Sequence, residues 1–284
     1  MLDVSATELE EAYRRCDEIA RSSNFYNGFR LLPPNKHRAL SAVYAFLRQC
    51  DDVSDDPGTL EQKEAAFSEW RRLLNEGMEN RISGHPTLPA LIDTIRDFKI
   101  PVEYFHLLMV GTESDLRVSS YPTFSDLQTY CYHVASVVGL ICIHIFGFED
   151  PGAKKSAEAC GIAFQLTNIL RDIKEDLARN RIYIPLEDLE RFQYTEDDLR
   201  HEVEDNRFRS LMAFEAERAR SFYEQARPLI KMLSKDSRSC FRAMYESYAT
   251  ILSRIQQKNY QVFGERIRLG PAEKFQILLK ALIT

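Results

Sequence analysis

Apolar residues recur at helical spacing through most of the chain, and few residues interrupt them. Gly and Pro number 11 each in 284 residues, and no stretch shows strands alternating with helices, which argues against a parallel sheet. The pattern predicts an all-α fold, and the length suits one domain, 1–284, with a sizeable core. The expected helices cover 7–23, 34–55, 60–76, 88–98, 102–112, a stretch capped by Ser125 and running towards Phe146, 154–176, and three or four more beyond 185.

Charge and cysteine content narrow the classes of function. The net charge of −6 argues against a nucleic-acid partner, which usually meets a basic face. Local arginines or a bound metal can still hold an anionic ligand. The six cysteines are scattered without a C-x-x-C pair, which favours buried free thiols in a reducing compartment. Because no signal-peptide pattern opens the chain, we expect a cytoplasmic protein. The sequence gives no oligomeric state.

Two apolar segments bear on membrane contact. Residues 134–148 form the most apolar run. It is shorter than the ~18 residues of a spanning helix and contains His144, so we expect a buried core helix. The C-terminal segment 274–284 is amphipathic. It is either the last helix packed on the bundle or a peripheral contact with a membrane surface.

The first of two acidic clusters lies near the end of the second expected helix. Its polar residues fall within about 60° of arc at about 100° per residue, and they are Tyr44, Arg48, Asp51 and Asp55. The opposite side carries apolar residues such as Phe46 that can pack. A single pair of acids at this spacing is usually a solvated helix face.

The second acidic cluster follows the same geometry about 120 residues later. Its narrow polar stripe consists of Gln165, Asn168, Asp172 and Asp176. An apolar stripe that starts at Ile162 runs beside it, so the acids border a core-facing surface. This amide and acid ladder has no evident packing role, which makes it the stronger signal of the two.

Carboxylates one turn apart repel each other, and placing them beside a core is costly unless a cation compensates. Hard oxygen ligands suit Mg²⁺, which keeps several waters and accepts phosphate oxygens. Two such helices facing each other across a cavity would hold a small magnesium cluster on a diphosphate. Arg48 and Arg171 lie one turn or less from the acids. They either neutralise the carboxylates or contact diphosphate oxygens bidentately.

Five sequence blocks are distinctive when taken together: Ser22–Tyr26, Tyr44–Asp55, Tyr130–Gly139, Gln165–Asp176 and Arg181–Pro185. With these blocks and their spacing, nearly the whole chain resembles the squalene and phytoene synthase family of head-to-head prenyl transferases. The resemblance implies the all-α isoprenoid synthase bundle with a central apolar cavity. Two positions depart from the family pattern: Asn24 stands where a serine is frequent, and Ser54 where a third acid is frequent.

The resemblance also implies roles for single residues. Two or three Mg²⁺ ions would bind with the diphosphate, held by Asp51, Asp55, Asn168, Asp172 and Asp176. Catalytic roles are implied for Tyr130, Arg48 and Arg171, with Tyr130 assisting ionisation or proton handling. Substrate contacts are implied for Ser22, Phe25, Tyr26, Tyr44, Arg48, Val137, Gly139, Gln165, Asn168, Arg171, Tyr183, Tyr248 and Arg266.

The implied reaction is the Mg²⁺-dependent head-to-head condensation of two prenyl diphosphates through a cyclopropyl intermediate. On overall similarity we expect two farnesyl diphosphates to give presqualene diphosphate or squalene, with peripheral membrane contact for product release. The alternatives are phytoene from two geranylgeranyl diphosphates, and dehydrosqualene. No G-x-G-x-x-G fingerprint is present, but the family does not use one, so NADPH use stays open.

Other classes of protein share parts of this pattern. Head-to-tail chain elongators and terpene cyclases have the same helical bundle and also bind metal through acidic clusters. The sequence blocks at Tyr130 and at Arg181–Pro185 argue against both classes. Outside enzymes, the alternative is a non-catalytic helical scaffold descended from such enzymes. A scaffold of that kind is expected to lose acids from the clusters, and both clusters are intact here.

Overall fold

The computed structural model describes residues 4–23, 25–82 and 84–283, and their regular structure is helical. Extended segments pair within these residues at two isolated bridges, Ser120 with Ile182 and Phe148 with Leu233. The all-α prediction is therefore confirmed. The α-helices are α1 (Ala6–Ala20), α2 (Tyr26–Phe29), α3 (Pro34–Asp55), α4 (Leu60–Met78), α5 (Leu88–Asp97), α6 (Val102–Ser114), α7 (Phe124–Cys131), α8 (Val137–Phe146), α9 (Gly152–Arg171), α10 (Ile173–Ala178), α11 (Leu186–Arg191), α12 (Glu196–Arg200), α13 (Asn206–Ala226), α14 (Leu229–Met232), α15 (Arg238–Gln257) and α16 (Pro271–Ile283).

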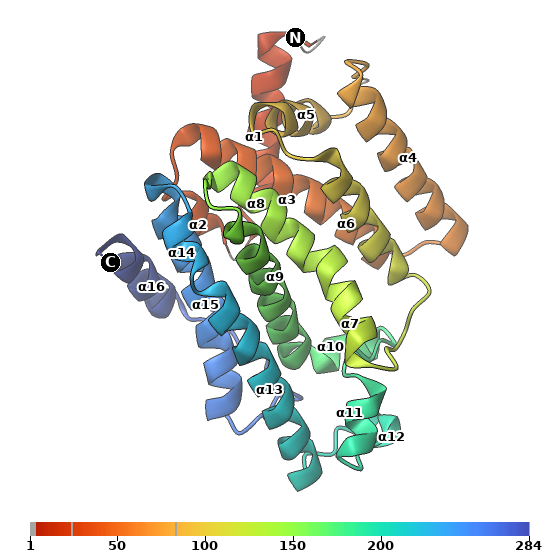
Figure 1. Ribbon diagram of the computed structural model, residues 1–284. Coiled ribbons are helices and arrows are strands. Elements are labelled where there is room, and N and C mark those ends of the chain that lie inside the picture. Colours follow the sequence, from red (N-terminus) through yellow and green to blue (C-terminus); the bar gives the residue numbers. More distant parts are fainter. Residues whose placement is uncertain (1–3, 24, 83, 284) are drawn as a thin grey trace.

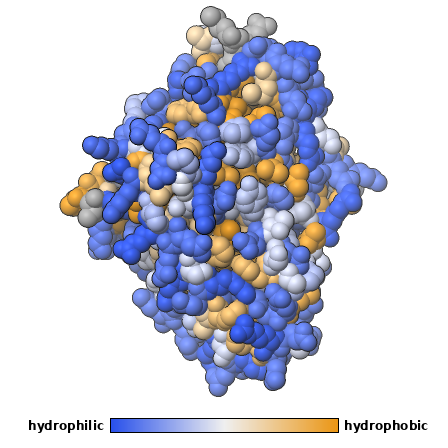
Figure 2. Space-filling model, viewed as in Figure 1, coloured by the Kyte–Doolittle hydropathy of each residue, from blue (hydrophilic) through white to orange (hydrophobic). Residues whose placement is uncertain are grey.

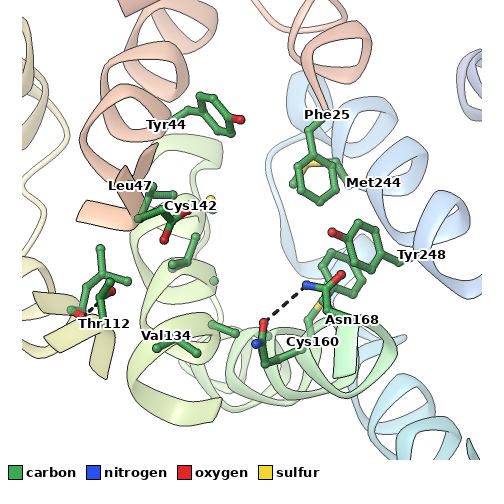
Figure 3. Close-up of a pocket in the computed structure, with 18 of the residues that line it drawn as sticks. Phe25, Tyr44, Leu47, Thr112, Val134, Cys142, Cys160, Asn168, Met244 and Tyr248 are labelled. Atoms are coloured by element: carbon green, nitrogen blue, oxygen red, sulfur yellow. Dashed lines mark hydrogen bonds between the residues drawn. The ribbon is translucent and has the colours of Figure 1, made fainter. Parts of the chain in front are cut away.

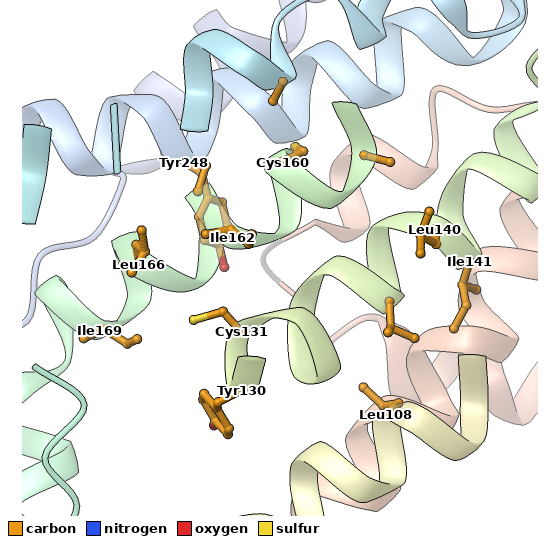
Figure 4. Packing of buried hydrophobic residues seen from close by; sticks show 14 of the residues in the cluster. Leu108, Tyr130, Cys131, Leu140, Ile141, Cys160, Ile162, Leu166, Ile169 and Tyr248 are labelled. Atoms are coloured by element: carbon orange, nitrogen blue, oxygen red, sulfur yellow. The ribbon is translucent and has the colours of Figure 1, made fainter. Parts of the chain in front are cut away.

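Helix α9 lies at the centre of the bundle, between α8 on one side and α13 and α15 on the other (Figure 1). Its apolar stripe is buried as predicted, because Ile162, Leu166 and Ile169 are each 5 % exposed or less. Figure 4 shows these side chains on α9 near Cys131 and Tyr130. Helix α3 packs against α1, α6 and α8. The two helices that carry the acidic clusters therefore belong to one bundle.

The helix that carries Tyr130 begins earlier than the sequence indicated and ends at Phe146, as expected. Thr123, not Ser125, is the N-cap, since its hydroxyl accepts from the Asp126 amide at 3.2 Å and the Asp126 carboxylate accepts from the Thr123 amide at 3.0 Å. Helices α7 and α8 are joined by a π-helical turn, η1 (Tyr132–Ser136). The resulting stretch, Phe124–Phe146, is long and apolar enough by composition to cross a membrane, and half of its most apolar window is buried in the molecule. It packs against α6 and α9 as a core helix of the bundle.

Two glycines allow the backbones of η1 and α8 to pack directly against the backbone of α9. A Cβ on Gly161 would lie 2.4 Å from the Ala135 carbonyl oxygen, and one on Gly139 would lie 2.6 Å from the Ala157 carbonyl oxygen. Both contacts are between backbones, so no side-chain rotation can relieve them. The packing of α9 against η1 and α8 therefore requires glycine at both positions.

Gly161→Ala is expected to lower the free energy of unfolding by about 1–3 kcal/mol, because the helices must separate to admit the methyl group. Chemical denaturation monitored by far-UV circular dichroism measures the change. Gly264→Ala is the control, since a Cβ there would meet no atom within 4 Å. Equal effects at the two positions would contradict the close-contact argument.

A buried charge cluster anchors the start of α7. The Arg218 guanidinium donates to Glu215 at 2.6 Å and to Asp188 at 2.7 Å, and it lies 4.0 Å from the centre of the Phe124 ring. One cation thus serves two carboxyl groups that are each about 3 % exposed or less. Burial raises the pKa of Glu215 to about 8, although the Arg218 charge opposes the rise. The folded state therefore holds a proton on Glu215 that an unfolded chain has released.

Between pH 5 and 8 the unfolded chain binds fewer protons at Glu215 than the folded chain, so stability falls as pH rises through this window. Glu215→Gln removes that dependence. For each unit of pH increase in this range, we expect the free energy of unfolding of the variant to rise relative to that of wild type by at most about 1.4 kcal/mol. Thermal melts at several pH values test the difference, with Glu217→Gln, an exposed carboxyl on the same helix, as control. Parallel curves for wild type and Glu215→Gln would contradict the buried proton.

Candidate active site

A cavity of about 490 Å³ opens between α3, α6, η1, α8, α9 and α15. Figure 3 shows Tyr44, Leu47 and Cys142 on one wall, and Phe25, Met244 and Tyr248 on the opposite wall. The body of the cavity is mostly apolar, and carboxylates and arginines from α3, α9 and the segment after α10 gather at one end. We call this end the polar mouth. The cavity therefore joins a charged entrance to a hydrocarbon-like interior.

The acids of α3 reach the polar mouth, but the predicted arginine does not. Asp51 and Asp55 line the cavity together with Tyr44 from the same helix face. Arg48 turns away from them and pairs with Asp52 at 2.7 Å, with its side chain about half exposed. Ser54, which stands where the family pattern has a third acid, is buried and also lines the cavity. The helical stripe was predicted correctly for the acids, whereas the long Arg48 side chain follows a neighbouring carboxylate.

The second ladder lines the same mouth, with one difference in the backbone. Gln165, Asn168, Asp172 and Asp176 all face the cavity, yet the helix predicted to run through them breaks at Asp172, where φ is −106° and ψ is 19°. The Asn168 amide nitrogen donates to Gln165 at 3.4 Å, while its oxygen is buried without a hydrogen-bond partner in the described structure. This buried acceptor is therefore available to a ligand.

Arginines hold two of the acids in place. Asp172 accepts from Arg171 at 2.7 Å and from Arg266 at 2.8 Å. Burial would raise the pKa of Asp172, but the two guanidinium groups outweigh it and lower the pKa. On the opposite side, Asp55 pairs with Arg179 at 3.0 Å and with Arg181 at 3.4 Å.

Arginines compensate the other two acids of the ladders less. Burial outweighs the effect of Arg48, which lowers the pKa of Asp51, and that of Arg179 and Arg181, which lower the pKa of Asp176. Burial, together with Asp55, raises the pKa of Asp51 to about 7, and burial, together with Asp172, raises the pKa of Asp176 to about 7. Asp51 is accessible from the cavity yet lies deep among protein atoms. Oxygen donors with raised pKa values and an unpaired amide oxygen fit a hard divalent cation. Among the described residues, no three Asp, Glu, His or Cys side chains are grouped so that they could hold a metal ion.

A tyrosine pair shares one carboxylate beside the mouth. The hydroxyls of Tyr130 and Tyr183 each donate to Asp115 at 2.9 Å, one to each oxygen. Burial raises the pKa of Asp115 against the influence of Arg181, and burial also raises the pKa of Tyr130 well above its usual value. Tyr130 therefore stays protonated and acts as a hydrogen-bond donor.

The opposite wall carries a stack of aromatic rings. The Tyr248 ring lies 4.5 Å from that of Phe164 and 5.1 Å from that of Phe25, measured between centroids and nearly parallel. All three line the cavity. Their π faces carry partial negative charge and can stabilise a cation.

Some predicted substrate residues lie elsewhere. The Ser22 hydroxyl donates to Ile19, and the Tyr26 hydroxyl donates to Asp17, so neither faces the cavity. Val137 is buried in the core, because the extra residue of the π turn shifts the helix phase and turns Val134 and Val138 to the cavity instead. Arg266 does not line the cavity, and its contact with the site is the hydrogen bond that it donates to Asp172. Asn24 lies outside the described residues.

Three charged residues of the mouth were not predicted as site residues. Asp115 follows the apolar helix α6 directly, and an acid at the end of an apolar helix was an available signal. Arg181 belongs to one of the distinctive sequence blocks, and Arg179 precedes it by two residues. No helical periodicity relates these two arginines to the acids they meet, since they lie in the connector after α10.

Comparisons with known proteins agree with this geometry. A family model for squalene/phytoene synthase matches residues 20–273. A 15-cis-phytoene synthase from Synechocystis is 38 % identical over 95 % of this chain and 84 % of its own length, and a phytoene synthase from Mycobacterium tuberculosis is 36 % identical over 97 % and 92 %. Among solved structures, a dehydrosqualene synthase superposes with a TM-score of 0.89 at 28 % identity, covering 97 % of both chains, and a squalene synthase from Alicyclobacillus acidocaldarius with 0.84 at 29 %, covering 90 % of this chain and 97 % of its own.

The fold and the charged mouth of an apolar cavity define a helical isoprenoid synthase, a prenyltransferase that condenses prenyl chains head to head. The chain belongs to the squalene/phytoene synthase family. Members of this family use a divalent metal with diphosphate substrates. The relatives favour the phytoene alternative over the squalene product that we expected first.

Proposed function

We propose that this chain is a phytoene synthase, which condenses two geranylgeranyl diphosphates into a C40 hydrocarbon. The observation that carries the proposal is the opposed pair of oxygen-rich helix faces at the mouth of one apolar cavity. The choice of the C20 substrate rests on relatives named phytoene synthase, which are 36–38 % identical over most of the chain.

The polar mouth would hold the diphosphates. Asp51, Asp55, Asn168, Asp172 and Asp176 supply oxygen donors for Mg²⁺. The chemistry supplied by bound Mg²⁺ is neutralisation of the charge that develops on the departing diphosphate. Arg171, Arg179 and Arg181 bring guanidinium groups to the same place, where they can bind phosphate oxygens bidentately.

The apolar cavity walls would surround the hydrocarbon chains of the substrates. The apolar interior excludes water from the allylic cation, and the stack of Phe25, Phe164 and Tyr248 presents π faces to it. Tyr130 holds a proton at its hydroxyl oxygen against Asp115, at the boundary between the mouth and the interior. In the proposed reaction, this pair assists departure of the leaving group and relays the proton that is lost when the cyclopropyl intermediate becomes phytoene.

Product identification tests the proposed function. The purified protein is incubated with Mg²⁺ and either farnesyl or geranylgeranyl diphosphate, with and without NADPH, and the products are identified by mass spectrometry. We expect phytoene from the C20 substrate, no effect of NADPH on its yield, and no product after chelation of the metal. A C30 product formed in preference would return the assignment to a squalene or dehydrosqualene synthase.

A further inference from the structure

The connector between α15 and α16, residues 258–270, brings Arg266 to Asp172 at the polar mouth. The Arg266 guanidinium donates to both oxygens of this carboxylate, from Nε at 2.8 Å and from Nη2 at 2.7 Å. Arg171 donates to the same carboxylate at 2.7 Å. Two cations thus surround one anion, and the surplus of positive charge favours an anionic ligand at this place. The position of Arg266 therefore bears on the binding of diphosphate.

Arg266 has a second acid within reach. Its Nε lies 3.5 Å from the carboxylate of Glu175, whose side chain is 44 % exposed. The side chain of Asp172, in contrast, is 14 % exposed. Because an arginine side chain rotates about several bonds, the position of its backbone decides which of the two acids it meets. A shift of the connector would exchange the pair at the mouth for an ordinary pair at the surface.

Side chains from two helices hold the connector on either side of Arg266. Lys174 of α10 donates to the carbonyl of Phe263, three residues before Arg266, at 2.8 Å. Arg254 of α15 donates to the carbonyl of Arg268, two residues after Arg266, at 2.7 Å. The backbone that carries Arg266 is therefore fixed at two points close to it.

The bond from Lys174 fixes the connector against the helix that begins beside Asp172. Helix α10 starts at the next residue, Ile173. Lys174 donates from this segment to the connector, and Arg266 donates from the connector back to Asp172. The acceptor of the lysine is itself well placed. Phe263 is 4 % exposed, and its ring packs on that of Phe208 with centroids 5.1 Å apart.

The hydrogen bond to Phe263 distinguishes Lys174 from an ordinary surface lysine. Lys174 also pairs with Glu202, two residues beyond α12, at 3.1 Å, and its side chain is about half exposed. Figure 2 shows mainly hydrophilic side chains where Figure 1 places α11 and α12. An ion pair on such a surface contributes little. A bond to the backbone of a buried residue, however, fixes one specific atom of the connector.

We propose that Lys174 is a positioning residue for diphosphate binding. Its bond to the Phe263 carbonyl holds the connector in the register that keeps Arg266 beside Asp172, and the surplus of positive charge there attracts diphosphate to the polar mouth. Lys174 does not line the cavity, and it acts through Arg266. The proposal rests on the function proposed above, because it takes the polar mouth as the diphosphate site.

Binding of inorganic pyrophosphate tests the positioning role without turnover. Isothermal titration calorimetry with Mg²⁺ compares wild type with two variants. We expect Lys174→Met to bind pyrophosphate about fivefold more weakly, because Arg266 spends less time where it can bind phosphate oxygens. Lys174→Arg keeps a donor and should bind within about twofold of wild type. Lys155→Met, which removes an exposed lysine at the start of α9, is the control and should match wild type.

A double-mutant cycle separates positioning from the charge of Lys174 itself. If Lys174 acts through Arg266, Lys174→Met weakens pyrophosphate binding in the wild-type background and causes no further loss when added to Arg266→Gln. Independent losses from the two substitutions would overturn the proposal, and so would unchanged binding by Lys174→Met. Far-UV circular dichroism and thermal melts check that each variant is folded.

Failure of this proposal is distinguishable from failure of the proposed function. Wild type that binds pyrophosphate and forms product, with an affinity that does not depend on Lys174, would overturn the positioning role alone. Wild type that binds no pyrophosphate would contradict the diphosphate site and both proposals with it. With prenyl diphosphate as substrate, KM should rise about fivefold in Lys174→Met while kcat stays within about twofold, a split that a general loss of folded protein would not produce.

Discussion

Asp51→Asn is expected to lower kcat by about 10²–10³-fold while leaving the protein folded. The substitution keeps the shape of the side chain and removes a carboxylate that lies in the polar mouth beside Asp55. Without it the cluster that neutralises the departing diphosphate loses an oxygen donor. The melting temperature should be equal or higher, because repulsion between two neighbouring acids, Asp51 and Asp55, is relieved. Steady-state kinetics over a range of Mg²⁺ concentrations and thermal melts measure both effects.

Asp56→Asn is the matched control for this experiment. Asp56 lies on the same helix end, is exposed, and does not line the cavity. Its variant should keep kcat within about threefold of wild type, as expected for a surface charge. If Asp51→Asn retains full activity, or if both variants lose activity equally, the assignment of the α3 acids to metal binding is wrong.

Tyr130→Phe is expected to lower kcat by about 100-fold with a smaller effect on KM. The substitution removes the hydroxyl that donates to Asp115 at 2.9 Å and keeps the ring, which stacks on Tyr183 with centroids 5.2 Å apart. Separate measurement of cyclopropyl intermediate and final hydrocarbon shows whether the loss falls on departure of the first diphosphate or on the later proton transfer.

Tyr121→Phe provides the comparison within the same aromatic cluster. Its ring lies 5.3 Å from that of Tyr130, but its hydroxyl makes no hydrogen bond to Asp115 in the described structure. This variant should retain kcat within about threefold, since it keeps the ring packing and the Asp115 contacts. Equal losses in the two variants would mean that hydroxyl groups in the cluster support packing and have no part in the chemistry.

Helical periodicity predicted the parts of the site that lie on long helices. Asp51 and Asp55 occupy one face of α3, and Gln165 and Asn168 one face of α9, so their spacing alone directs them to one side. Periodicity failed where the backbone leaves the regular helix. The helix predicted through Asp172 breaks there, which separates α9 from α10. Val137, for which the resemblance implied a substrate contact, follows the π turn at 132–136 and is buried in the core.

Long-range partners could not be read from local spacing. The sequence left Arg48 either to neutralise a carboxylate or to contact diphosphate, and in the structure it pairs with Asp52 at the surface. The positive charge beside Asp55 comes instead from Arg179 and Arg181, more than 120 residues away. Asp115 meets Tyr130 and Tyr183 only through the packing of α6, α7 and the segment after α10. Such contacts depend on the tertiary fold and carry no periodic signal.

The ion pairs of Asp55 with Arg179 and Arg181 would make binding of the proposed metal ion and binding of diphosphate interdependent. A diphosphate that attracts these arginines leaves the carboxylate in need of another cation. A metal ion that occupies the carboxylate frees the arginines for phosphate. Each ligand would therefore strengthen binding of the other. The coupling free energy is the same whether metal or diphosphate binds first. The enzyme is expected to bind metal and diphosphate together far more tightly than either alone.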